Sequence, residues 1–296
     1  MGIDETPVRM LFENQDVHGA RKLILPLEDA FYAARPDVTL REATDACLGE
    51  GYPSFAGLVG LIMDHPGCFH PYRKSIEYGY LSFPIGNPKA NAVVVPGGGY
   101  EMIASANEGL DFVRPLQEAG YSVYIAGYGI KDDACFPKPV IQVAECLREA
   151  GRLPTLLLGF SAGGHLSATI CRKDMTEAFD YPRPQALILG YPVISFSLPT
   201  HEPSKRWFTG GRGDLFDFLS AEGHVDPDYP PTYLWRAESD DVVPPINSDA
   251  FDRALSQRGV RHLYRVYPGD GHGWGMGEGT SAEGWLDEAL SFLRQK

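Results

Sequence analysis

Thr155-Leu156-Leu157-Leu158-Gly159-Phe160-Ser161-Ala162-Gly163-Gly164-His165 is the stretch that decides the fold of this 296-residue chain. Its first half is apolar, as in a buried strand, and a sequence that favours a helix follows the glycines. The pentapeptide between them has the pattern G-x-S-x-G, which in this context sets a serine on a sharp turn from strand to helix. Side chains in place of the two flanking glycines would collide with the neighbouring strand or helix. We therefore predict that Ser161 is a nucleophile; the alternative is a glycine-rich loop with an incidental serine.

Short apolar runs alternate with stretches of helical pattern from residue 76 onward. Strands are expected over residues 76–83, 92–95, 121–126, 155–160, 186–190, 232–236 and 262–267, and helices over 106–119, 140–150, 162–172, 246–258 and 282–295. Parallel strands need crossover connections, and helices of ten to fifteen residues supply them. The pattern therefore predicts an α/β fold, with a mostly parallel central sheet and helices on both faces.

Two regions depart from this regular pattern. Residues 1–75 are predicted to form an N-terminal extension that packs on a catalytic domain of residues 76–296, with candidate helices over 40–48 and 54–63. Residues 196–228 gather proline, glycine and polar side chains and are too long for a simple connection, so we expect a lid-like insertion there. Both regions are candidates for shaping a substrate pocket.

Composition narrows the classes of partner. The net charge of −13 argues against nucleic acid or an anionic membrane surface and favours neutral or weakly charged substrates. No apolar run approaches the roughly 18 residues of a membrane span. Five cysteines without a C-x-x-C pair suit reduced thiols and not a disulfide framework or zinc site, and the acidic start of the chain lacks a secretory signal. We expect a cytoplasmic protein without metal or cofactor; the sequence leaves its oligomeric state open.

Two loops after Ser161 carry the groups that a serine nucleophile needs. A serine hydroxyl is a poor nucleophile at neutral pH, so a base must take its proton and a third group must orient the base. His272 lies among glycines after the last expected strand, and we predict that it is the base. The acid is expected at the end of the preceding strand, but several carboxylates lie near these loops: Glu238, Asp240, Asp241 and Asp270.

A run of three glycines follows the expected strand 92–95, in Pro96-Gly97-Gly98-Gly99-Tyr100. Without side chains there, backbone N–H groups can point into a cavity and form an oxyanion hole. One such donor contributes roughly 3–4 kcal/mol of transition-state stabilisation. The run lacks the spacing and the lysine of a phosphate-binding loop, so nucleotide binding is not expected.

These motifs resemble the α/β-hydrolase superfamily, and within it the bacterial acetyl esterase, lipase and xylan-esterase-like group. The resemblance extends from about residue 76 to the C-terminus and includes Pro96–Tyr100, Asn107-Glu108-Gly109, Gly159–His165, Pro230-Pro231-Thr232, Asp240–Pro244, Asn247-Ser248 and Gly271-His272-Gly273. It implies that Asp240, four residues before Pro244, is the acid. It also implies that the oxyanion donors are the N–H groups of Gly98, Gly99 and Ala162.

Two positions depart from the family pattern. Pro96 stands where the hormone-sensitive-lipase group has a histidine, which favours the carbohydrate-esterase-like branch. Gly127-Tyr128-Gly129 replaces a turn that usually bears an arginine, so contacts in that region are expected to differ.

The residues and the resemblance together predict a serine carboxylesterase that acts on small acyl esters, with acetylated carbohydrates as candidate substrates. Ser161 would attack the ester carbonyl, His272 would accept its proton, and Asp240 would orient His272. One alternative is a peptidase or amidase with the same triad, although oligopeptidases of this fold carry a gating domain larger than residues 1–75. The other is a non-catalytic binding protein of the hydrolase fold, a class that typically lacks a triad residue.

Overall fold

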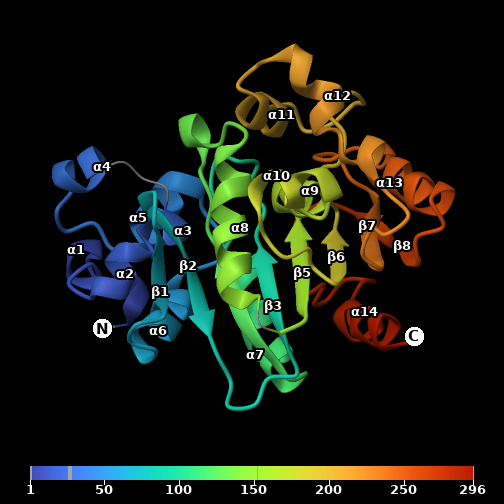
Figure 1. The fold of residues 1–296 in the computed structure, drawn as a ribbon. Helices are drawn as coiled ribbons and strands as arrows, with labels where there is room; N and C mark the ends of the chain where they lie inside the picture. The colour runs from blue at the N-terminus through green and yellow to red at the C-terminus, as the bar shows by residue number, and fades with distance from the viewer. Residues whose placement is uncertain (1, 26–28, 152, 296) are drawn as a thin grey trace.

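The computed structural model describes residues 2–25, 29–151 and 153–295 (Figure 1). The strands are β1 (Phe69–Tyr72), β2 (Ser75–Phe83), β3 (Ala90–Val95), β4 (Tyr121–Ala126), β5 (Thr155–Phe160), β6 (Ala186–Gly190), β7 (Thr232–Ser239) and β8 (His262–Asp270). The α-helices are α1 (Val8–Leu11), α2 (Gln15–Gly19), α3 (Arg21–Ile24), α4 (Asp29–Ala34), α5 (Leu40–Leu48), α6 (Ala56–Asp64), α7 (Asp111–Glu118), α8 (Lys138–Ala150), α9 (Ser161–Ile170), α10 (Lys173–Phe179), α11 (Glu202–Thr209), α12 (Phe216–Leu219), α13 (Ile246–Gln257) and α14 (Trp285–Arg294). Shorter helical turns are η1 (Ile3–Glu5), η2 (Ala106–Leu110), η3 (Lys131–Asp133), η4 (Gly213–Leu215) and η5 (Ala221–His224).

The strands form one sheet in the order β1-β2-β4-β3-β5-β6-β7-β8. β1 pairs antiparallel with β2 and β2 antiparallel with β4, whereas every pair from β4 to β8 is parallel. The predicted α/β fold with a mostly parallel sheet is therefore confirmed. The strand order reverses between β3 and β5, because β4 lies on one side of β3 and β5 on the other. In open α/β sheets, ligands bind at the carboxyl ends of the strands beside such a switch point.

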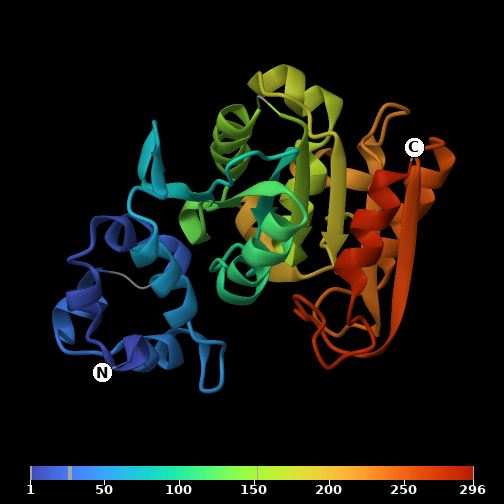
Figure 2. The same ribbon diagram turned by 90° about the horizontal axis from the view of Figure 1, so that it is seen from below.

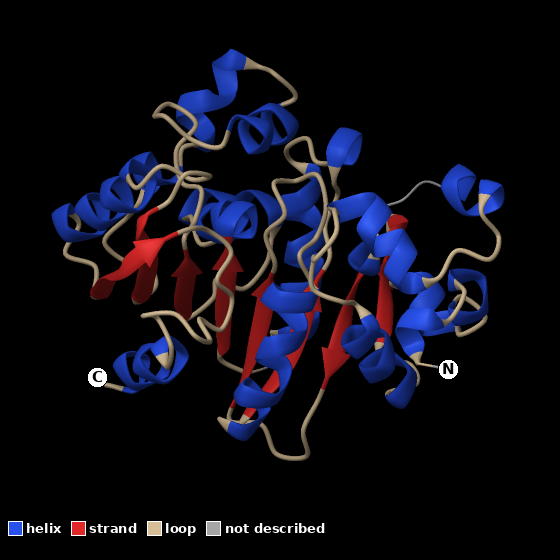
Figure 3. Ribbon diagram, turned by 180° about the vertical axis from the view of Figure 1, so that it is seen from behind, coloured by secondary structure: helices blue, strands red, loops and turns tan. Residues whose placement is uncertain are grey.

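Helices cover both faces of the sheet. α8 and α9 pack against the central strands on one face, and α7 and α14 contact strands on the opposite face (Figures 2 and 3). A strand covered on both faces needs apolar side chains at successive positions. β5 fulfils this requirement, because each of its residues is buried.

The two irregular regions lie at different edges of this sheet. The helices of the N-terminal segment lie beside β1 and β2, and α11 and α12 of the 196–228 segment lie beyond the carboxyl ends of the parallel strands (Figure 1). The sheet itself begins at Phe69, a few residues before the predicted boundary at residue 76. Among the residues that the structure describes, no helix has the length and apolar character to cross a bilayer.

One expected helix differs in a way that matters for the site. The sequence predicts a single helix over residues 106–119, but the first turn is the π-helix η2 and only Asp111–Glu118 is α-helical. The Leu110 N–H donates to the carbonyl of Ser105 at 2.8 Å, five residues back. This wider turn carries Glu108, whose side chain is buried. Single π-turns of this kind occur frequently at functional sites.

Candidate active site

Ser161 lies on the turn between β5 and α9, at the carboxyl end of the sheet. Its φ of 50° is in the left-handed region, which residues other than glycine rarely adopt. The glycines on either side permit this close turn. A Cβ on Gly163 would collide with the carbonyl oxygens of Val95 and Pro96, and one on Gly159 would meet the Ser167 side chain. The sequence thus folds here into the strand-turn-helix arrangement that the G-x-S-x-G pattern predicts.

The structure brings Ser161, His272 and Asp240 together from three strand ends. His272 Nε2 lies 2.8 Å from Ser161 Oγ, and His272 Nδ1 lies 2.7 Å from Asp240 Oδ2. An ionised carboxylate only accepts hydrogen bonds, so these partners assign the imidazole proton to Nδ1 and leave Nε2 to accept the serine proton. The glycines around His272 adopt positive φ, 130° at Gly271 and 74° at Gly273, backbone conformations that glycine adopts readily.

Asp240, and not the adjacent Asp241, is the carboxylate beside His272. Its side chain is only 1% exposed, whereas Asp241 is exposed. The second oxygen, Oδ1, accepts the N–H groups of Val242 at 3.0 Å and Val243 at 2.9 Å. These two donors hold the carboxylate in one orientation.

The glycine loop after β3 lines the same cavity as Ser161. Its carbonyls are occupied: Tyr128 Oη donates to Pro96 O at 2.6 Å, and Met102 N–H donates to Gly98 O at 3.1 Å. Tyr128 lies in the turn where the family resemblance expects an arginine. Gly98 and Gly99 have φ of 114° and 66° and line a cavity with Ser161. The start of α9, with the Ala162 N–H, lies beside them and has N–H groups without an intrahelical acceptor.

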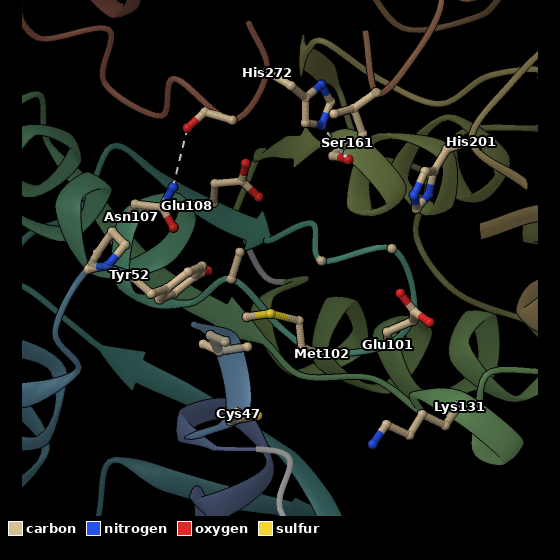
Figure 4. Close-up of a pocket in the computed structure, with 17 residues that line it drawn as sticks. Cys47, Tyr52, Glu101, Met102, Asn107, Glu108, Lys131, Ser161, His201 and His272 are labelled. Atoms are coloured by element: carbon tan, nitrogen blue, oxygen red, sulfur yellow. Dashed lines mark hydrogen bonds between the residues drawn. The ribbon is translucent and has the colours of Figure 1, made fainter. Parts of the chain in front are cut away.

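The cavity next to Ser161 has a volume of about 720 Å³, within the roughly 300–1,000 Å³ typical of small-molecule sites. Figure 4 shows Ser161 and His272 at one side, with Tyr52 and Cys47 across the cavity. Its lining residues are Cys47, Leu48, Tyr52, Pro53, Gly98, Gly99, Glu101, Met102, Ala104, Asn107, Glu108, Lys131, Ser161, His201, Val242, His272 and Gly273. Acidic, basic and apolar groups all occur around it.

The N-terminal segment and the 196–228 segment each supply part of this lining. Cys47 and Tyr52 come from the end of α5 and the loop after it, and His201 precedes α11. His201 Nδ1 lies 2.8 Å from Ser204 Oγ, and burial lowers the pKa of His201. None of these contributions had a signal in the sequence beyond the expectation that both regions could shape a pocket.

Glu108 is a buried carboxylate in the site that the sequence did not single out as functional. It is 3% exposed and accepts the Gly97 N–H at Oε2, 2.6 Å away, and the Tyr191 hydroxyl at Oε1, 2.8 Å away. Burial raises the pKa of Glu108, whereas these two donors and the positive charge of a protonated His272 act to lower it. Over residues 2–25, 29–151 and 153–295 there is no group of three or more histidine, cysteine, aspartate or glutamate side chains placed to hold a metal ion.

Sequence comparison identifies a family match over the second half of the chain. The Prolyl oligopeptidase family matches residues 155–296, which include Ser161, Asp240 and His272. An acetylxylan esterase from Xylanibacter ruminicola is 30% identical over 216 residues, 64% of this chain and 42% of that protein. Endo-1,4-beta-xylanase B from Butyrivibrio fibrisolvens is 27% identical over 214 residues, 65% of this chain and 34% of that protein. The chain thus spans less than half the length of either relative.

Comparison with solved structures extends this likeness to the fold. An acetyl ester-xyloside bifunctional hydrolase from Caldicellulosiruptor lactoaceticus is 27% identical, with a TM-score of 0.62 over 72% of this chain and 85% of that one. A carboxylesterase from Lactobacillus plantarum is 23% identical, with a TM-score of 0.63 over 74% of this chain and 92% of that one, and shows the likeness of fold alone. With the strand order and the serine turn already described, these matches show that the chain has the α/β-hydrolase fold.

Proposed function

We propose that this protein is a serine carboxylesterase that hydrolyses small acyl esters. The observation that carries the proposal is the chain of hydrogen bonds from Ser161 through His272 to Asp240, at distances of 2.8 and 2.7 Å, beside a cavity. The order serine, acid, histidine along the chain is that of the α/β-hydrolases.

In the proposed reaction, His272 Nε2 accepts the Ser161 proton as Oγ attacks the ester carbonyl carbon. Asp240 keeps the other imidazole nitrogen protonated and stabilises the imidazolium that forms. The negative oxygen of the tetrahedral intermediate accepts hydrogen bonds from the Gly98, Gly99 and Ala162 N–H groups. The imidazolium then gives its proton to the leaving alkoxide. Water, activated by His272, hydrolyses the acyl-enzyme in a second pass through the same steps.

Acetylated carbohydrates are the candidate natural substrates. The relatives that support this choice are an acetylxylan esterase and an acetyl ester-xyloside bifunctional hydrolase. The mixed lining is consistent with an alcohol rich in hydroxyl groups, since Glu101, Lys131 and His201 lie together at one side (Figure 4). Such side chains donate to and accept from hydroxyl groups.

A peptidase or amidase is the second candidate, because the Prolyl oligopeptidase family is the one that matches residues 155–296. The same triad chemistry cleaves amides. Turnover of an aminoacyl anilide compared with that of p-nitrophenyl acetate separates the two activities.

The test combines labelling with a substrate panel. A fluorophosphonate probe should label the wild-type protein at Ser161, and Ser161→Ala should abolish both labelling and hydrolysis of p-nitrophenyl acetate while it leaves the fold intact. An absence of labelling would instead favour a non-catalytic binding protein. Esters that vary in acyl length and alcohol, acetylated xylo-oligosaccharides among them, then define the substrate.

We also propose a cytoplasmic location. All five cysteines are free thiols, and reduced thiols are typical of that compartment. Cell fractionation with an antibody against the native protein tests this assignment.

A further inference from the structure

Glu108 is a buried carboxylate for which the acyl-transfer steps above have no use. It lies in the π-turn η2, and its Oε2 accepts the N–H of Gly97, the first glycine of the oxyanion loop. The two groups are packed tightly, because a Cβ on Gly97 would lie 2.8 Å from Glu108 Oε2 and 2.7 Å from Ser161 Cβ. Glu108 thus fixes the base of the loop next to the nucleophile.

The other oxygen of Glu108 is connected, through the hydroxyl of Tyr191, to the loop that carries His272. Oε1 accepts the hydroxyl of Tyr191 at 2.8 Å, and the same hydroxyl oxygen accepts the Gly275 N–H at 2.9 Å. The Tyr191 ring also meets the His272 ring edge-on, with centroids 4.8 Å apart.

Asn107, the residue before Glu108, also contacts the loop that carries His272. Asn107 Nδ2 donates to the Gly273 carbonyl at 3.3 Å, which is the dashed line in Figure 4. The Gly275 backbone approaches the Asn107 carbonyl so closely that a Cβ there would lie 2.7 Å from it. The π-turn therefore contacts the oxyanion loop on one side and the histidine loop on the other.

We propose that Glu108 is a positioning residue that fixes the oxyanion loop and the His272 loop relative to each other through Gly97 and Tyr191, and whose negative charge favours the protonated state of His272 during acyl transfer. The inference rests on the proposed esterase function and adds a role for a residue outside the triad.

The hydrogen bonds indicate that Glu108 is ionised. The Tyr191 oxygen already accepts the Gly275 N–H, so its own proton points at Glu108, and the Gly97 N–H points at the other oxygen. Both oxygens therefore act as acceptors, as a carboxylate requires. The titratable groups that face it from neighbouring elements are Tyr52, Tyr128, Tyr191 and His272. Of these, only the imidazole gains a positive charge in the reaction.

Glu108→Gln tests the charge with little change in volume. Its amide oxygen can still accept the Gly97 N–H, but its NH₂ group must then face the Tyr191 hydroxyl, which loses an acceptor for its proton. We expect kcat/KM for p-nitrophenyl acetate to fall by roughly 10- to 100-fold, as small displacements of catalytic groups do. The acidic limb of its pH profile should move to lower pH, because the protonated imidazole loses a favourable negative charge.

Tyr191→Phe tests the connection and keeps the charge. It should lower kcat/KM as well but leave the acidic limb in place, and the double variant should lose less than the product of the two single losses, because both residues act through one contact. Tyr181→Phe is the matched control. Its buried hydroxyl donates to the Ile170 carbonyl at 2.8 Å, away from the cavity, so the wild-type rate and profile should persist.

The outcomes separate this inference from the proposed function. An inactive wild-type protein whose Ser161 resists the fluorophosphonate probe removes the esterase proposal itself. If the wild type is active, a folded Glu108→Gln with wild-type kcat/KM overturns the role of Glu108, and so does a reduced rate with an unmoved acidic limb. If thermal unfolding shows that this variant does not fold, Tyr191→Phe decides: wild-type kcat/KM in that variant also overturns the inference.

Discussion

Asp240→Asn should separate the role of the acid from its contribution to packing, because asparagine has nearly the same volume. Asp240 meets three donors: the Val242 and Val243 N–H groups at Oδ1 and His272 Nδ1 at Oδ2. An asparagine has one acceptor oxygen and one NH₂ group for these two positions. If the NH₂ faced the two backbone N–H groups, donors would oppose donors at about 3 Å and lose roughly 1–3 kcal/mol for each unpaired group.

The favoured orientation therefore keeps the amide oxygen on the backbone and turns the NH₂ toward His272 Nδ1. That nitrogen must then accept, so the imidazole proton moves to Nε2, the atom 2.8 Å from Ser161 Oγ. The base then faces the nucleophile with a donor and cannot take its proton. For an Asp-to-Asn change that imposes the wrong tautomer, kcat falls roughly 10⁴-fold, which corresponds to about 5 kcal/mol of transition-state stabilisation.

The assay is the hydrolysis of p-nitrophenyl acetate over a range of pH, with urea unfolding as the check on the fold. Asp241→Asn is the matched control, since that carboxylate is adjacent in sequence but exposed. We expect wild-type kcat from the control and a folded, nearly inactive Asp240→Asn. A folded Asp240→Asn with more than a tenth of the wild-type kcat, or an equal loss in Asp241→Asn, would refute the reasoning.

Three further changes test the elbow, the cavity wall and a buried histidine. Gly163→Ala should destabilise the fold by about 1–3 kcal/mol in urea unfolding, since its Cβ would collide with the Val95 carbonyl oxygen, whereas Gly223→Ala, with open space around it, should not. Tyr52→Ala should raise the preference for longer acyl chains in p-nitrophenyl esters by up to roughly fourfold per methylene; an unchanged preference contradicts the wall assignment. Burial lowers the pKa of His165 to about 4. The unfolded chain therefore binds this proton at higher pH than the folded chain does. The free energy of unfolding should fall as the pH drops from about 6.5 to 4, by about 3 kcal/mol in all. His165→Gln should flatten that part of the stability curve measured by urea unfolding; the same slope in both proteins contradicts the assignment.

The parts of the site that could be predicted from sequence are those with local backbone signals. The turn at Ser161 needs glycines at fixed offsets, and the loop after β3 needs several in a row, so each leaves a pattern that can be read without the fold. The alternation of strands and helices then places the ends of β3, β5, β7 and β8 at one edge of the sheet. This is why the expected parallel sheet agrees with the one observed.

The parts that could not be predicted depend on which side chains turn inward. Asp240 and Asp241 are chemically identical neighbours that local patterns do not distinguish. The spacing to Pro244 in the resembled family points to Asp240, and the turn after β7 places that carboxylate beside His272. In the sequence, Glu108 is one polar residue in a helical pattern. A single π-turn changes the direction of its side chain without changing the composition, so the pattern does not show it. Tyr52 lines the cavity beside Ser161 although it is far from Ser161 in sequence, and nothing in its local sequence predicts that contact.

Backbone strain is concentrated after the strands that carry the site. Of the five non-glycine residues with positive φ in the described part of the chain, Tyr100, Ser161 and Tyr191 follow β3, β5 and β6, and Lys131 lines the cavity. Each such residue costs of order 1–3 kcal/mol and persists only where its surroundings fix it. Tyr100 and Tyr191 are almost wholly buried, and their hydroxyls are hydrogen-bonded to His165 and Glu108. Buried side-chain contacts thus hold the strained backbone that presents the glycine loop and Ser161, so a substitution that relaxes this strain should stabilise the fold and slow the reaction.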